Sequence, residues 1–132
     1  MMKRIFAFAL CIIIVGSVIG TSIATATIQP LWSNLRVLEL HTSRSNNTVT
    51  SSTTVIGQSG TTRISASYTL EKWENYRYQP VDSWSASSNS ASLLNTRTTP
   101  NCSAGTYRLR VTVTVTRNGT IETVSDLLVK AL

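Results

Sequence analysis

The sequence has little of what catalytic centres and metal sites are built from. It contains one histidine, two cysteines and six acidic residues in 132. A tetrahedral zinc site needs clustered cysteine and histidine, and a calcium loop needs several carboxylates at short spacing. Neither pattern occurs, and the sequence has no glycine-rich phosphate loop. We therefore expect a non-enzymatic protein with no catalytic residues, no metal and no cofactor.

The few reactive side chains are not spaced for catalysis either. His41 and Cys102 could form a thiol and imidazole pair, but no local motif supports one, and a surface histidine is the simpler interpretation. Glu71 and Glu74 are three residues apart, the wrong spacing for two side chains on one face of a strand. The only other cysteine is Cys11, near the N-terminus, in the segment that we expect to be removed. Cys102 is therefore either a free thiol or bonded between chains.

The one long hydrophobic run lies at the N-terminus. Lys3 and Arg4 precede an apolar stretch, 5–19, and small residues follow, ending in Ala24-Thr25-Ala26. A membrane span would need about 20 apolar residues, and this run is shorter. The pattern predicts a secretory signal peptide, 1–26, hence a secreted, extracellular protein that meets a membrane only through this segment before cleavage. Cleavage would remove Lys3 and Arg4 and lower the net charge from +6 to +4.

The remainder is expected to form an extended lead-in, 27–34, and a single β-sandwich domain, 35–132. About a hundred residues suffice for one modest core. Alternating apolar and polar residues predict strands, and no helical repeat occurs after the signal. The expected strands are Leu35–His41, Thr48–Gly57, Thr61–Trp73, Tyr76–Ala86, Ser90–Arg97 and a hairpin within Gly105–Ser125. Pro80 indicates that the fourth strand is an edge strand, since proline cannot donate to the ladder.

Two strands have a clear buried face. In the third strand the apolar face is Ile64, Ala66, Tyr68 and Leu70. In the sixth, the inward residues are Tyr107, Leu109, Val111, Val113 and Val115, and the outward ones are Arg108, Arg110, Thr112, Thr114 and Thr116. About seven short strands separated by turns predict an all-β, antiparallel, immunoglobulin-like sandwich. Tyr107, just after Gly105, resembles the tyrosine corner of immunoglobulin-like and fibronectin-like folds, although without the paired cysteines of antibody domains.

The final hairpin can close in two registers. A two-residue turn at Asn118-Gly119 would put Glu122 opposite Val115 and Asp126 opposite Val111, on the buried face. A three-residue loop starting at Arg117 would instead bring apolar residues inward, with Ile121 opposite Val115, Leu127 opposite Leu109 and Asp126 opposite Arg110. Turn preferences are worth about a kilocalorie, less than burying two unpaired carboxylates. We therefore expect the three-residue loop.

Three stretches together resemble a known group of proteins. They are SGTTRISASYTLEKW at 59–73, VDSW at 81–84 and GTYRLRVTVTV at 105–115. This order is similar to that of small secreted proteins of Gram-positive bacteria, grouped as a family of unknown function. The resemblance implies export and one compact β domain. It assigns no activity and supplies no catalytic residue.

One segment has an unusual local composition. WENYRYQPVDSW, at 73–84, holds two of the three tryptophans and two of the four tyrosines. Aromatic faces stack on sugar rings, on nucleobases or on cations, so this segment is the candidate binding site. The candidate residues are Trp73, Tyr76, Arg77, Tyr78 and Trp84. Alternatively, these rings are cross-strand pairs that only stabilise a hairpin.

A second candidate surface is basic. Arg108 and Arg110, with Arg36, Arg63 and Arg97 nearby, could bind an anionic wall polymer or a membrane surface. The alternative is a solvated strand face, partly neutralised by Asp126 opposite Arg110. Export and a small net charge argue against nucleic acid as a partner.

The sequence thus predicts a secreted, non-enzymatic binding or interaction module. Its ligand is not identified, with cell-wall polymer or carbohydrate as the expected class of partner. The alternative is a self-assembling surface structural protein or a secreted toxin-like effector.

Overall fold

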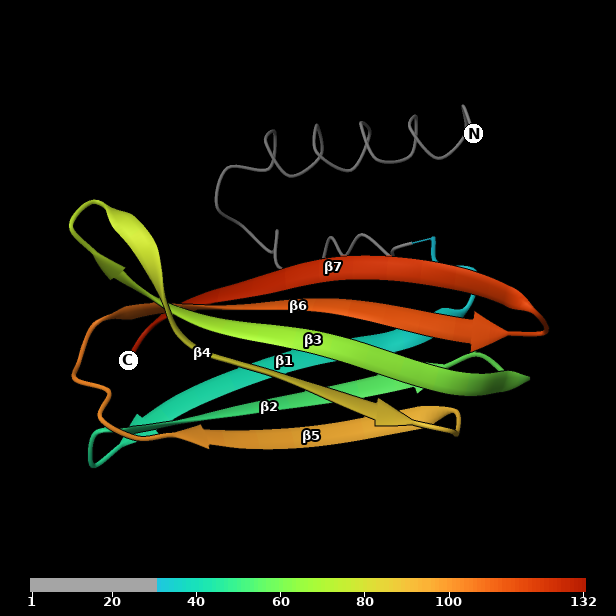
Figure 1. Cartoon of the computed structure of the whole chain (residues 1–132), viewed down its shortest axis with the longest axis horizontal. Helices are drawn as coiled ribbons and strands as arrows, with labels where there is room; N and C mark the ends of the chain where they lie inside the picture. The colour runs from blue at the N-terminus through green and yellow to red at the C-terminus, as the bar shows by residue number, and fades with distance from the viewer. Residues whose placement is uncertain (1–30) are drawn as a thin grey trace, which may run out of the picture. The chain divides into compact units, whose positions relative to one another are not determined.

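The computed structural model describes residues 31–132, and the fold lies within one compact unit, Ser33–Leu132. The predicted signal peptide, 1–26, and the first half of the lead-in, 27–30, lie outside the described residues. Seven strands form two sheets packed face to face (Figure 1). They are β1 Leu35–Ser45, β2 Thr48–Gly57, β3 Thr61–Glu74, β4 Arg77–Ser88, β5 Ser92–Thr99, β6 Thr106–Arg117 and β7 Thr120–Ala131. The predicted all-β, antiparallel sandwich of seven strands is confirmed.

The two sheets differ in size. The three-stranded sheet has the order β1-β2-β5, and the four-stranded sheet has the order β4-β3-β6-β7. In an immunoglobulin constant-type domain the fourth strand lies beside the fifth, whereas here β4 pairs with β3. β4 is consequently an edge strand, as Pro80 predicted. β1 continues beyond His41 to Ser45, because its pairing with β2 runs on to Thr48, and Thr42 in this extension is buried.

Three hairpins close with two-residue turns in which both turn residues have positive φ. This conformation matches the twist of the flanking strands, and asparagine and glycine tolerate it best. Asparagine is the first residue of all three turns. The turn residues are Asn46 and Asn47, Asn75 and Tyr76, and Asn118 and Gly119.

The core is formed by the residues that the alternation predicted. Both inward rows are fully or almost fully buried: Ile64, Ala66, Tyr68 and Leu70 in β3, and Tyr107, Leu109, Val111, Val113 and Val115 in β6. The Tyr107 hydroxyl donates a hydrogen bond to the Ser103 carbonyl oxygen at 2.6 Å, which forms the expected tyrosine corner. Burial, together with the adjacent Cys102 thiol, raises the pKa of Tyr107 to about 12. Cys102 itself is buried and forms no disulfide within residues 31–132.

The expected register of the final hairpin was wrong. Asn118 and Gly119 form a two-residue turn, and Glu122 lies opposite Val115. Burial of Glu122 is not the penalty that we assumed, because its carboxylate accepts hydrogen bonds from the backbone N–H groups of Ser33, Asn34 and Leu35 at 2.7, 2.8 and 2.9 Å.

The second carboxylate, Asp126, lies opposite Val111 near the open edge of β7 and is exposed. With both carboxylates accommodated, the turn preference decides the register. Ile121 and Leu127 therefore point away from the core and are 69% and 51% exposed.

Candidate functional site

A bulge in β4 decides which aromatic rings reach the outer face of the four-stranded sheet. Leu70 pairs with Asp82, but Glu71 pairs with Pro80, so Val81 is an extra residue in β4. Such a bulge bends and twists the strand that contains it. Beyond the bulge the β3–β4 hairpin curls away from the end of the sandwich (Figure 1).

Trp73 and Tyr78 form a cross-strand pair in this hairpin, on the outer face of the sheet. Their ring centroids are 5.0 Å apart, with an edge-to-face angle of 69°. The guanidinium carbon of Arg108 lies 4.0 Å from the centroid of the Tyr78 ring. Trp73 is nevertheless 47% exposed. We call these three residues, Trp73, Tyr78 and Arg108, the aromatic platform.

Glu71 fixes the arginine of the platform. Its Oε1 lies 2.8 Å from Nε of Arg108 and 3.3 Å from Nε of Arg110. Glu71 is only 7% exposed, so both arginines are held against a buried carboxylate. A buried, hydrogen-bonded acceptor of this kind reduces the freedom of the Arg108 side chain and holds it against the Tyr78 ring.

The arginines do not assemble into the basic face that the sequence suggested. Arg110 lies opposite Leu127, not Asp126, and it is Glu71 that neutralises it. Arg97 belongs to the other sheet and pairs with Asp82 at 2.9 Å. Three of the five arginines are thus divided between two separate ion pairs, and a fourth, Arg63, donates to Oδ1 of Asn89.

Tyr76 and Arg77 lie at the tip of the same hairpin. Tyr76 is 94% exposed and has a φ of 64°. For a residue with a Cβ atom this left-handed conformation costs roughly 1–2 kcal/mol. An exposed aromatic ring in a strained position suggests a role other than stability.

Replacement of Tyr76 by glycine tests this strain. Glycine adopts positive φ without steric cost, but it also increases the entropy of the unfolded chain. We expect Tyr76→Gly to raise the free energy of unfolding by about 0.5–1 kcal/mol, measured by urea denaturation. Thr62→Gly, at an exposed site in β3, is the control and should destabilise the domain. Equal destabilisation by both changes would contradict the strain.

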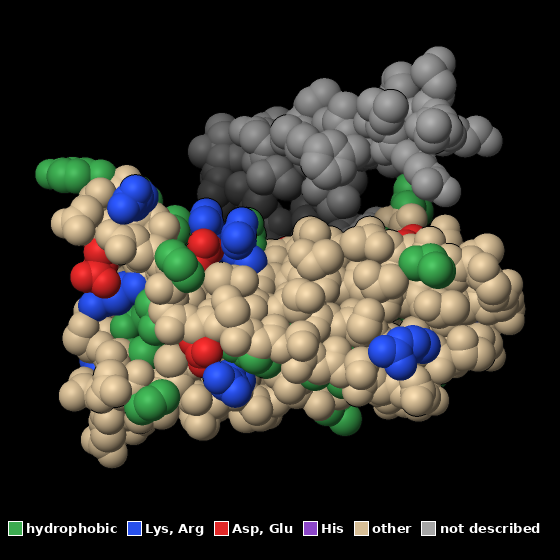
Figure 2. Space-filling model, viewed as in Figure 1, with side chains coloured by type: hydrophobic (Ala, Val, Ile, Leu, Met, Phe, Trp, Pro, Cys, Tyr) green, Lys and Arg blue, Asp and Glu red, His purple; other side chains and the backbone are tan. Residues whose placement is uncertain are grey.

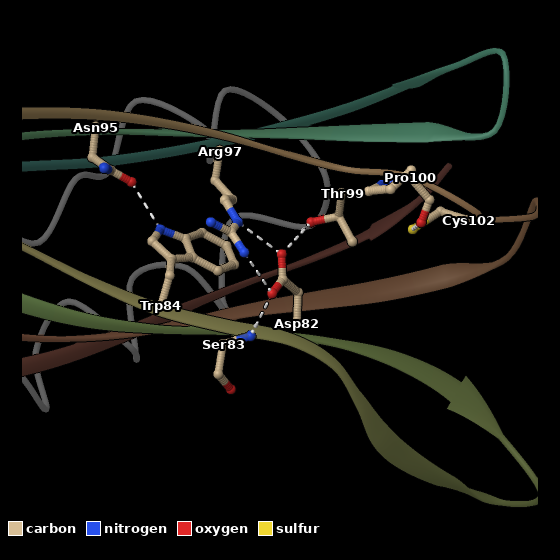
Figure 3. Close-up of polar contacts among 8 residues, drawn as sticks. All are labelled: Asp82, Ser83, Trp84, Asn95, Arg97, Thr99, Pro100 and Cys102. Atoms are coloured by element: carbon tan, nitrogen blue, oxygen red, sulfur yellow. Dashed lines mark hydrogen bonds and ion pairs between the residues drawn. The ribbon is translucent and has the colours of Figure 1, made fainter.

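Trp84, the remaining candidate, is not part of the platform. It stacks on Tyr68, with ring centroids 5.2 Å apart and an interplanar angle of 14°. Its indole Nε1–H donates to Oδ1 of Asn95 in β5 at 2.8 Å (Figure 3). Trp84 therefore packs between the two sheets and closes the core at the β4 and β5 edges.

Asp82 forms a polar clasp between the same two strands. Its carboxylate accepts hydrogen bonds from Arg97 at 2.9 and 3.1 Å and from the Thr99 hydroxyl at 2.7 Å (Figure 3). The Arg97 hydrogen bond, aided by Thr99, lowers the pKa of Asp82 below its ordinary value in spite of partial burial. The clasp joins the two edge strands, which are not hydrogen-bonded to each other through their backbones.

The structure thus unites Trp73 and Tyr78, places Tyr76 and Arg77 at the nearby turn, and assigns Trp84 to packing. Sequence reasoning did not identify Glu71 as the partner of Arg108. Directly opposed opposite charges on paired strands would have been the signal, but it becomes visible only when the pairing of β3 with β6 is known.

Among residues 31–132, no three His, Cys, Asp or Glu side chains come together as metal ligands. His41 is exposed on β1, whereas Cys102 is buried. No helix in this part of the chain has the length and hydropathy to cross a bilayer.

Neither a protein-family model nor a curated protein matches this chain. The functional argument therefore depends on the geometry of the site.

Proposed function

We propose that this chain is an exported, non-enzymatic binding module, and that the aromatic platform holds a sugar ring of a carbohydrate or cell-wall polymer. The single observation that carries this proposal is the half-exposed Trp73 ring, which packs edge to face against Tyr78, whose own ring lies against Arg108. A rigid ring loses little entropy when a ligand stacks on it. The resemblance to small secreted proteins of Gram-positive bacteria belongs to the same proposal and depends on the three sequence stretches alone.

The chemistry of the platform suits a largely neutral ligand. Glu71 is paired with both Arg108 and Arg110 and offsets one of their two positive charges, so an anionic polymer would have to compete with a buried carboxylate. A sugar ring offers C–H groups to the aromatic face and hydroxyl groups to the guanidinium donors that remain free. This argument favours carbohydrate over a strongly anionic wall polymer.

The platform is tested by Trp73→Ala. Sedimentation with insoluble chitin, cellulose and peptidoglycan measures the fraction of protein that is bound. We expect the native protein to bind at least one of these polymers, and Trp73→Ala to bind it at least about tenfold more weakly, since a buried aromatic contact is worth about 1.5–3 kcal/mol. Binding of Trp73→Ala at the native level would contradict the platform.

The matched control is Leu94→Ala. Leu94 is 74% exposed on β5, in the other sheet, so its loss removes a similarly exposed hydrophobic side chain without touching the platform. We expect native binding from this variant. Unfolding curves for both variants separate lost binding from lost folding.

Self-assembly through strand edges is the less favoured alternative. The four-stranded sheet has two edge strands, β4 and β7, and β7 directs Glu122, Asp126 and Lys130 toward the inner side. Inward-pointing charges on an edge strand hinder the addition of another strand. Light scattering at high concentration is expected to give a monomer.

A further inference from the structure

Two complete rows of hydroxyl side chains cross the outer face of the four-stranded sheet. Strand pairing forms the first row from Ser85, Ser67, Thr112 and Ser125. The second row, two residues along each strand, is Ser87, Ser65, Thr114 and Thr123. These rows contain no charged and no purely apolar residue, and a broad area without charged side chains occupies the middle of the face in Figure 2.

Half of these eight hydroxyls have no hydrogen-bond partner among the side chains of residues 31–132, and the other half are paired with each other. Thr112 and Ser125 are 3.2 Å apart, and Thr114 and Thr123 are 3.3 Å apart, so each of these pairs can share one hydrogen bond. The four serines of β3 and β4 make no side-chain hydrogen bond to another residue within 31–132. Two shallow depressions lie on this face. One is lined by residues of the first row together with Arg110 and Asp126, and the other by residues of both rows together with Arg63. Each hydroxyl can both donate and accept.

The rows continue the surface that begins at the aromatic platform. Along β3 the outward residues run from Trp73 through Glu71 and Thr69 to Ser67 and Ser65. Eight residues of extended strand cover roughly 27 Å. An extended ligand that lies along β3 and β6 would therefore meet the aromatic rings at one end and hydroxyls beyond them.

We infer that the hydroxyl rows are a second part of the binding site, and that the ligand is an extended neutral glycan chain instead of a single sugar. This inference rests on the proposed function. Its physical basis is complementarity: an uncharged array of paired donors and acceptors matches a polymer of hydroxyl groups. The rows themselves contain no charged and no purely apolar side chain, and the charged side chains that line the depressions are Arg63, Arg110 and Asp126.

The twist of the sheet selects a flexible chain over a crystalline surface. Neighbouring strands are rotated by about 20–25°, so the four strands turn through roughly 65° in total. A flat crystal face could touch only part of such a surface. A single glycan chain can follow the twist and contact both rows.

The test is the dependence of affinity on ligand length. Calorimetric titrations would use cello-, chito- and manno-oligosaccharides, from disaccharide to hexasaccharide. For a series that binds, we expect the affinity of the native protein to rise at least about tenfold from disaccharide to hexasaccharide, from two or more added hydrogen bonds. The double variant Thr112→Val, Thr114→Val should lose about this factor for the hexasaccharide and bind the disaccharide as the native protein does.

The matched control carries the same two changes on the other sheet. Thr50 and Thr54 face outward on β2, so Thr50→Val with Thr54→Val removes two surface hydroxyls outside the proposed site. We expect native affinities for every length. If the native protein bound all lengths with equal affinity, the hydroxyl rows would not be part of the site. The same would follow if the Thr112 and Thr114 variant bound the hexasaccharide as tightly as the native protein. Neither result would contradict binding at the aromatic platform. A native protein that binds no member of any series would overturn both.

Discussion

Leu109→Ala is expected to lower the free energy of unfolding by about 3 kcal/mol, the typical cost of a cavity in a packed core. Leu109 is fully buried, in a cluster with Val49 of the opposite sheet, Leu70, Tyr107 and Cys102. Such a loss is a large fraction of the 5–15 kcal/mol that stabilises a typical domain. Urea denaturation followed by tryptophan fluorescence measures it.

Leu127→Ala is the matched control and also tests the register. Leu127 lies on β7, opposite Arg110 on β6, and is 51% exposed on the outer face. We expect its loss to change the free energy of unfolding by less than about 0.5 kcal/mol. If the hairpin had the three-residue loop, Leu127 would point inward opposite Leu109. A cost for Leu127→Ala comparable with that of Leu109→Ala would therefore refute the observed register.

The central strands could be predicted because their sequences alternate strongly. β6 places five apolar residues on one face and polar residues on the other, so only one orientation buries the apolar row. β7 is different, because polar residues occur on both of its faces. The carboxylate of Glu122, which this register turns inward, is accommodated by backbone groups of Ser33–Leu35, which are more than eighty residues away in the sequence. No local pattern contains that information.

The candidate site was predictable to the same limited extent. Trp73 and Tyr78 meet within one hairpin, so their proximity follows from the turn between them. Tyr78 and Trp84 are six residues apart and would share a face in a regular strand. The bulge at Val81 moves them to opposite faces, and this is why Trp84 packs in the core. Arg108 joins the platform through the pairing of β3 with β6, which the sequence does not specify.

Glu122 links the lead-in to the final hairpin, and its carboxylate is the acceptor on which three backbone N–H groups depend. Asn34 strengthens the same junction, because its side-chain amide donates to the carbonyl oxygens of Val115 and Thr120 at 3.0 and 3.1 Å. Glu122→Ala removes the acceptor but leaves the backbone in place. We expect the free energy of unfolding to fall by about 2 kcal/mol, a value reduced for the solvent exposure of part of this site.

The pH dependence of stability separates the charge of Glu122 from its hydrogen bonds. Partial burial raises the pKa of Glu122, but the three backbone donors outweigh burial and hold it below the ordinary 4.5. Its contribution is therefore complete above this ordinary value and is lost as the pH falls through the lowered pKa of the folded state. Glu122→Gln keeps an acceptor without the charge, so its stability deficit relative to the native protein should be largest near neutral pH and shrink in acid.

Glu39→Gln, at an exposed position of β1, is the control and should show almost no deficit at any pH. A Glu122→Gln deficit that stays constant from neutral pH into acid would show that the charge of this carboxylate does not hold the lead-in.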